Sequence, residues 1–168
     1  ACLLVFPHRD LSADEAESAR HGRALTPAGM PNPRAHLSEA VLGAACAAEA
    51  YLRHAARVAV YNFSDALMGG KTVVPFTTDR QTIYEGLCVY HGGGTSLRLR
   101  DLDELRLTVP RATPDLLLIT DMQLTNLEDV ITYLAGIEGR ITVIHLGENT
   151  ATDHFRAATQ HHPRLQIF

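Results

Sequence analysis

The sequence predicts an α/β fold in which a doubly wound, mostly parallel sheet carries helices on both faces. Short apolar runs alternate with helical patterns along the chain, and most of these runs are apolar at nearly every position. Parallel strands that are covered on both faces have this continuous hydrophobicity. Strands and helices that alternate in this way form right-handed crossovers around one sheet.

Five short runs are expected to form the buried strands of this sheet. They are Cys2–Phe6, Arg57–Phe63, Asp115–Thr120, Arg140–Leu146 and Leu165–Phe168. A sixth run, Lys71–Phe76, also has an extended pattern, but Pro75 cannot donate a hydrogen bond to a neighbouring strand. We therefore expect this sixth strand to lie at an edge of the sheet.

Helical patterns occupy the spaces between the runs. The first helix is expected to begin with Asn32 as its cap and Pro33 as its first residue, and its alanine-rich face predicts close packing on the sheet. Further helices are expected at Arg80–Tyr90, Asn126–Ala135 and Ala151–His161, and the segment Asp101–Leu107 is left open as another.

Length and charge limit the number of domains and the classes of partner. A chain of 168 residues, 46% of them hydrophobic, suits one domain over residues 1–168. The net charge of -4, without clustered Lys or Arg, argues against a nucleic-acid or anionic-membrane partner. No apolar run approaches the roughly 18 residues of a membrane span, and no secretory signal is recognisable at the start.

Three separated cysteines indicate the redox setting. Cys2, Cys46 and Cys88 each lie in an apolar run and do not have the spacing of metal ligands. This pattern favours buried, reduced thiols over a disulfide scaffold, so we expect a cytoplasmic protein.

The segment from Asp10 to Pro31 does not fit the alternating pattern. It is polar and rich in glycine and proline, and it separates the first strand from its helix by more than the usual few residues. We expect a polar insertion or a mobile loop at residues 10–31.

Two motifs point to a cation site. Thr95 follows three glycines in Tyr90–Leu97, and Asp121 comes one residue after the apolar run Asp115–Thr120. Loops at the carboxyl ends of parallel strands meet where the strand order reverses, so this hydroxyl and this carboxylate are expected to lie close together. Mg²⁺ prefers such oxygen ligands and takes only one or two carboxylates. In the alternative interpretation, Thr95 caps a helix and Asp121 starts a turn or caps the helix near Asn126.

The sequence offers weaker support for catalysis. The stretch Gly92–Thr95 lacks the Lys-Ser/Thr ending of a phosphate-binding loop, and Ser64 is not set in a G-x-S-x-G motif. His145 lies within a strand run and is expected to be a hydrogen-bonded core histidine. No nucleophile–base pair is recognisable.

Several motifs in order resemble a von Willebrand factor A (vWA) domain. They are RVAVYNFSD, KTVVPFTTDRQTIYEGLCVYHGGGTSL and DLLLITDMQLTNLEDVITYL, and the resemblance runs from about Pro31 to the end. It implies a Rossmann-like doubly wound sheet with one antiparallel edge strand. It also implies a metal-ion-dependent adhesion site, in which Thr95 and Asp121 match the later threonine and aspartate ligands.

The first ligand element of that family, Asp-x-Ser-x-Ser, has two possible alignments here. In one, Asp10 and Ser12 supply the first Asp and Ser, and Asp14 replaces the second Ser. In the other, the element falls on Leu25–Gly29, which offers no ligand side chain and implies a degenerate site. The second alignment fits the distance to the first helix better.

The function expected from these observations is a protein-interaction or scaffold module without catalytic turnover. It is expected to bind another protein, or another domain of the same chain, and to hold Mg²⁺ through Thr95, Asp121, Asp10 and Ser12 if the site is intact. The resemblance implies work beside an ATPase partner. The alternative is a small Mg²⁺-dependent hydrolase or phosphatase on a similar sheet.

Overall fold

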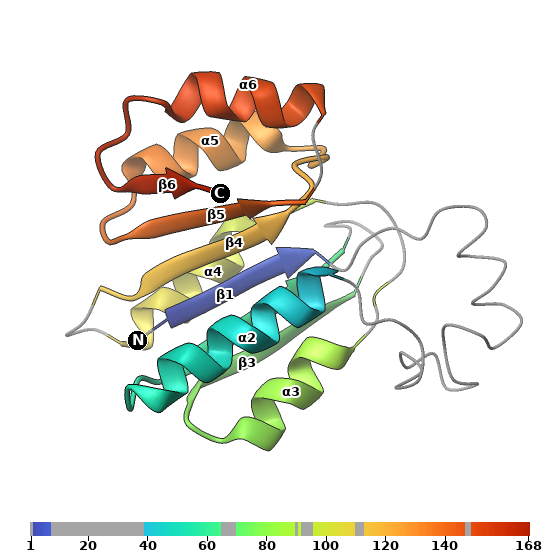
Figure 1. Cartoon of the computed structure of the whole chain (residues 1–168), viewed down its shortest axis with the longest axis vertical. Coiled ribbons are helices and arrows are strands. Elements are labelled where there is room, and N and C mark those ends of the chain that lie inside the picture. The colour runs from blue at the N-terminus through green and yellow to red at the C-terminus, as the bar shows by residue number, and fades with distance from the viewer. Residues whose placement is uncertain are drawn as a thin grey trace, which may run out of the picture.

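A computed structural model of the chain confirms the predicted α/β fold class (Figure 1). It describes residues 2–7, 39–64, 70–89, 91, 96–109, 113–146 and 149–168. The strands are β1 (Cys2–Pro7), β2 (Val58–Phe63), β3 (Lys71–Thr77), β4 (Asp115–Thr120), β5 (Ile141–His145) and β6 (Leu165–Ile167). The helices within these ranges are α2 (Glu39–Arg53), α3 (Arg80–Cys88), α4 (Leu99–Leu107), α5 (Leu127–Gly136) and α6 (Thr150–Thr159).

The six strands form one sheet in the order β3-β2-β1-β4-β5-β6. All neighbours pair in parallel except β2 and β3, which are antiparallel. The edge position predicted for the strand with Pro75 is therefore confirmed. The chain moves from β1 outward to β3 and then returns to β4 on the other side of β1, so the strand order reverses between β1 and β4.

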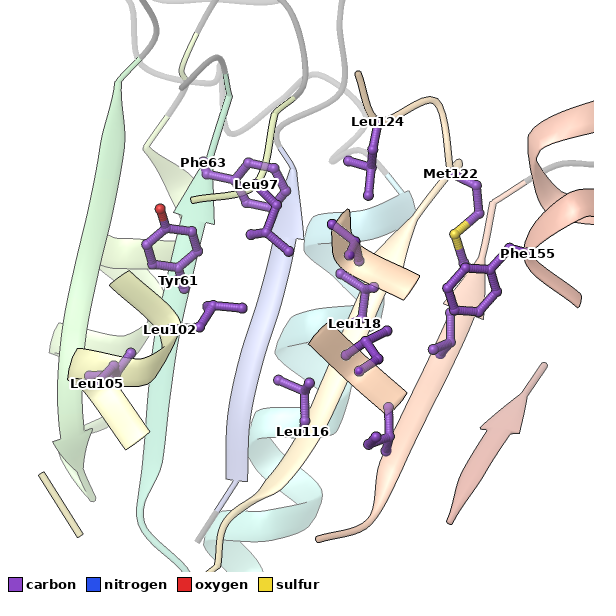
Figure 2. Close-up of a cluster of buried hydrophobic side chains, with 14 of the residues drawn as sticks. Tyr61, Phe63, Leu97, Leu102, Leu105, Leu116, Leu118, Met122, Leu124 and Phe155 are labelled. Atoms are coloured by element: carbon purple, nitrogen blue, oxygen red, sulfur yellow. The ribbon is translucent and has the colours of Figure 1, made fainter. Parts of the chain in front are cut away.

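Apolar residues of the sheet pack against helices on both faces. On one face, Val58, Val60, Leu117 and Ile119 contact the buried sides of α2 and α3. On the other face, Tyr61, Leu116, Leu118 and Val143 contact α4, α5 and α6, as Figure 2 shows for part of this cluster. Because β1 and β4 lie at the centre of the sheet, the point between them where the strand order reverses is packed by apolar clusters on both faces.

The expected helices agree with the structure except at their ends. The segment Asp101–Leu107, for which a helix was not decided from the sequence, is helical as part of α4. Asp79 caps α3 by accepting a hydrogen bond from the Gln81 N–H at 3.1 Å. The predicted first-helix start at Asn32 and Pro33 lies outside the described residues, as does the insertion predicted at 10–31. In the part that is described, this helix runs from Glu39 to Arg53.

The cysteine prediction was wrong at one position. Cys46 is exposed on α2, whereas Cys88 is half-buried and Cys2 has no described side-chain environment. Cys46 falls on the solvent side of α2 because the helix turns Val41, Ala44 and Ala48 toward the sheet. Hydrophobicity of the run alone could not distinguish these two sides.

Helix α4 is fixed to the sheet by a polar contact at its first turn. The Tyr61 hydroxyl donates to Asp101 Oδ2 at 2.8 Å, and Lys71 Nζ lies 2.7 Å from the same oxygen. Burial by itself raises the pKa of Asp101, but the bonds from Lys71 and Tyr61 outweigh it and hold that pKa below its usual range. Asp101 is therefore ionised at neutral pH and joins α4 to both β2 and β3.

Within the described ranges, none of the helices has the length and hydrophobicity needed to cross a membrane.

Candidate functional site

Asp121 lies at the point where the strand order reverses. Leu118 of β4 pairs with Val5 of β1, and the two parallel strands end at Thr120 and Pro7. Asp121 is the first residue after β4 and is half-buried. In Figure 1 the arrowheads of β1, β4 and β5 point to the same side of the molecule. This carboxyl edge is where open α/β sheets bind ligands.

The backbone around Asp121 is held by its own side chain and by the start of α6. Asp121 Oδ1 accepts a hydrogen bond from the Gln123 N–H at 3.0 Å, and its carbonyl oxygen accepts one from Asn149 Nδ2 at 2.7 Å. Asn149 also caps α6 by accepting from the Thr152 N–H. The alternative role of Asp121, starting a turn, is thus observed, but it occupies only one carboxylate oxygen. The other accepts no hydrogen bond from any residue that the structure describes.

Met122 makes the turn after Asp121 sharp. Its φ angle is +64°, in the left-handed region, which costs a residue with a side chain about 1–2 kcal/mol. Its side chain is fully buried, and Figure 2 shows it directed toward the Phe155 ring of α6. Burial of this side chain offsets the backbone strain, so the core beneath the edge fixes the direction in which Asp121 leaves β4.

The residues that follow Thr95 are tied to the same edge. The Ser96 N–H donates to the carbonyl oxygen of Ser64, directly after β2, at 2.9 Å. Asn126 Oδ1 accepts from the Leu97 N–H at 3.0 Å, and Asn126 Nδ2 donates to the Leu97 carbonyl at 2.8 Å. The chain next to Thr95 is therefore held between the end of β2 and the loop that carries Asp121.

Of the four predicted ligands, only Asp121 belongs to the described residues. Thr95, Asp10 and Ser12 lie outside them, so their distances to Asp121 are not described. Residue Pro7, where β1 ends, borders the edge that the first alignment requires for Asp10 and Ser12. The structure thus places Pro7, Ser96 and Asp121 at one edge, and Asp121 is the one predicted ligand whose position it describes.

Sequence reasoning missed the residues that hold the loops together. Asn126 was expected as the first residue of a helix, but it occupies the cap position of α5, and its side chain pairs with Leu97 and makes no cap bond. Asn149 was not singled out. Its place one residue before Thr150, the first residue of α6, is a signal that could have been read from the sequence.

Asp121 is the one predicted ligand among the described residues, and its carboxylate oxygen is of the type that hard cations prefer. Among the described residues, no three His, Cys, Asp or Glu side chains lie close enough to share a metal ion. Mg²⁺ keeps several waters and takes only one or two carboxylates, so a single carboxylate at this edge is compatible with it.

His145 does not have the environment of a free base. It is half-buried at the end of β5, and its Nε2 is hydrogen-bonded by Arg156 Nη2 of α6. The expected hydrogen bond is present, but the side chain is half-buried and does not lie in the core as predicted.

Comparison with known sequences gives a match to one short segment. The family described as "tRNA Pseudouridine synthase II, C terminal" matches residues 6–37. Over 30 residues the chain is 73% identical to tRNA pseudouridine synthase B of Mycobacterium sp. (strain KMS). This matched stretch covers 18% of this chain and 10% of that protein. The same enzyme of Mycolicibacterium paratuberculosis (strain ATCC BAA-968 / K-10) is 70% identical over 30 residues, again with 18% and 10% covered. The chain thus spans a tenth of the length of these curated relatives.

Comparison with solved structures gives a match to the whole fold. The chain is similar to the protein of "Crystal Structure of the SpRpn10 VWA domain", with a TM-score of 0.56 and 11% sequence identity, over 99% of this chain and 85% of that one. The resemblance to vWA domains is therefore confirmed for the fold. Asp10 and Ser12 fall inside the segment that resembles the synthases, whereas Asp121 falls outside it.

Proposed function

We propose that this chain is a protein-interaction module of the vWA type, which binds its partner at the carboxyl edge of the sheet. The observation that carries the proposal is the position of Asp121, directly after β4 and beside the end of β1, where the strand order reverses. The bonds of Asn126 to Leu97 support it, because they bring the chain next to Thr95 to the same edge.

Asp121 and Thr95 are the ligands that we assign to a Mg²⁺ ion at this edge. The carboxylate oxygen of Asp121 that is not used by the Gln123 N–H would face the ion, and the Thr95 hydroxyl would complete part of its shell. When bound, Mg²⁺ supplies positive charge and an open coordination position for a carboxylate of the partner. Asp10 and Ser12 remain additional ligands under the first alignment. A degenerate site without them remains the second alternative.

The partner that we propose is another protein or another domain of the same chain. A vWA-type module that works beside an ATPase is the arrangement implied by the sequence resemblance. We propose no catalytic turnover, and a cytoplasmic setting stays part of the proposal. The hydrolase alternative needs a nucleophile and a base next to Asp121. His145, the base considered from the sequence, is hydrogen-bonded to Arg156.

Titration with Mg²⁺ tests the metal part of the proposal. A ligand that binds only the folded protein at about 100 times its Kd adds roughly 2.7 kcal/mol to the free energy of unfolding. We therefore expect the melting temperature to rise with Mg²⁺ and with Mn²⁺, and isothermal calorimetry to give a Kd for one site.

Glu138→Gln is the matched control for this titration. Glu138 is exposed and precedes β5, so it lies near the amino ends of the parallel strands, away from the carboxyl edge. Removal of its charge should therefore leave the titration unchanged. A wild-type protein whose melting temperature does not respond to either ion would overturn the metal site. Turnover of a generic phosphate ester that depends on Asp121 would favour the hydrolase instead.

A further inference from the structure

Strand β6 lies at an edge of the sheet. It pairs in parallel with β5, and no other strand that the structure describes pairs with its second side. Figure 1 shows β5 between β4 and β6, with β6 as the last strand on this side. An edge strand presents backbone N–H and C=O groups that another strand can bind.

The hydrogen bonds to β5 show which residues of β6 point away from the sheet. The Phe168 N–H donates to the Val143 carbonyl at 2.9 Å, and the Phe168 carbonyl accepts from the His145 N–H at 3.0 Å. Both backbone groups of Phe168 are thus used by β5. Because the two sides of a strand alternate from residue to residue, Leu165 and Ile167 direct their N–H and C=O groups away from β5.

These outward groups lie beside an apolar surface. The Ile167 N–H and C=O have no backbone partner among the described residues, and the Leu165 N–H makes one long bond, 3.4 Å, to the His162 carbonyl. The side chains of Leu165 and Ile167 are half-buried and pack against the apolar cluster that contains Phe155. The edge therefore offers hydrogen-bonding groups and an apolar face to one additional strand.

The opposite edge of the sheet is protected against such pairing, whereas β6 is not. Strand β3 carries Pro75, and its register with β2 shifts between Val58 and Val60, where β3 has one residue more than β2. Prolines and bulges are features that keep edge strands from pairing. Strand β6 reads Leu-Gln-Ile and has no proline, charged residue or register shift. Each chain therefore has one edge that is open to pairing, and association through it ends at a dimer.

The outward residues of β6 are complementary to those of a second copy. When two β6 strands run antiparallel around Gln166, Leu165 of each copy lies opposite Ile167 of the other. Both residues point their N–H and C=O groups outward, so each pair exchanges two hydrogen bonds. The leucine and isoleucine side chains of each pair also meet on the face that carries the apolar cluster.

The same register agrees with the charges at this edge. It brings Phe168 of one copy opposite Arg164 of the other, and both side chains are exposed, Phe168 by 67%. A guanidinium group over an aromatic ring is a favourable contact. The two Arg164 residues lie four positions apart along the paired strands, roughly 13 Å, so like charges do not meet.

We propose that β6 is a homodimerisation edge, at which two copies of this chain join their sheets into one sheet of twelve strands, six from each copy. The two copies run antiparallel across the new pair, so the carboxyl edges of their parallel strands face opposite directions. The dimer thus presents two carboxyl edges on opposite sides. This inference does not depend on the proposed function.

Sedimentation equilibrium of the full chain tests the proposal. The paired segment is short, and interfaces below about 1,200 Å² are typical of weak complexes, so we expect a dimer Kd on the order of 100 µM. Ile167→Pro removes an outward N–H that β5 does not use, a position where edge strands tolerate proline. We expect this variant to keep the circular dichroism of the wild type and to raise the dimer Kd at least about tenfold.

Arg164→Glu tests the register without a change in the strand backbone. Loss of the contact with Phe168 should raise the dimer Kd about threefold. Arg57→Glu is the matched control, because it makes the same charge change at an exposed residue before β2, on the other half of the sheet. The dimer Kd of this control should equal that of the wild type.

Three results would overturn the proposal. The first is a wild type that stays monomeric up to about 1 mM, which would leave the β6 edge to a strand of another protein. The second is a dimer whose Kd is the same in the wild type, Ile167→Pro and Arg164→Glu. The third is equal weakening by Arg164→Glu and Arg57→Glu, because it would show general charge repulsion. If Ile167→Pro does not fold, the comparison of the two charge variants decides.

Discussion

Replacement of Phe155 by alanine should lower the free energy of unfolding by about 3–5 kcal/mol, the range for loss of a buried aromatic side chain. Phe155 is fully buried where α6 packs on the sheet, in the same cluster as Leu118, Val143 and Met122. Neighbouring side chains cannot move in to fill a cavity at this position, because the strands and helices that carry them are held in place by the sheet. Urea denaturation followed by circular dichroism measures the loss.

Phe168→Ala is the matched control for this change. It removes the same side chain from a residue that is 67% exposed. We expect the free energy of unfolding to change by no more than about 0.5 kcal/mol. Equal losses in the two variants would contradict the packing described here. Because Met122 points toward Phe155, the Phe155→Ala variant should also bind Mg²⁺ less tightly at temperatures where it remains folded.

Asp121→Asn should weaken Mg²⁺ binding at least about 100-fold while leaving the fold intact. Loss of a residue that only orients a metal ligand lowers affinity about 10- to 100-fold, so loss of the ligand charge itself should exceed that range. Asparagine retains the oxygen that accepts the Gln123 N–H, so the turn after β4 should persist. The free energy of unfolding without metal should therefore stay within about 0.5 kcal/mol of wild type.

Asp121→Ala separates the two roles of this side chain. Alanine removes both the charge and the turn-forming acceptor, and we expect a further loss of about 1 kcal/mol in metal-free stability. Calorimetry with Mg²⁺ and thermal denaturation without it measure the two effects independently. Equal Mg²⁺ affinity in wild type and Asp121→Asn would remove Asp121 from the site.

The arrangement of strands was predictable because burial on both faces leaves a strong local signal. The runs at Asp115–Thr120 and Arg57–Phe63 are apolar at most positions, and the structure places them inside the sheet, each with a neighbouring strand on both sides. Pro75 predicted the edge for a local reason, the missing N–H. The direction of β3 relative to β2 was implied only by the family resemblance, since local sequence does not distinguish parallel from antiparallel pairing at an edge.

The arrangement of the candidate site was predictable only in part, because its loops depend on long-range contacts. Asp121 was found from its place after a strand, and the turn that it starts was among the alternatives. The pairing of Asn126 with Leu97 joins residues 29 positions apart, and no local pattern announces it. The buried Asn62 was missed for the same reason, because the hydrogen bond from its Nδ2 to the Val89 carbonyl at the end of α3 joins residues 27 positions apart. The exposure of Cys46 was missed because it depends on which side of α2 faces the solvent, and an apolar run does not show this.

The ion that we propose binds at the carboxyl edge of the sheet, between Asp121 and the chain next to Thr95. Paramagnetic Mn²⁺ in place of Mg²⁺ tests this directly, through the amide signals in a nitrogen-15 correlation spectrum. We predict selective broadening of Ser96, Met122 and Gln123, with the signals of Ile137 and Gly139 at the opposite edge unchanged, and loss of this broadening in Asp121→Asn. Broadening centred on other residues, or the same broadening in Asp121→Asn, would contradict the claim.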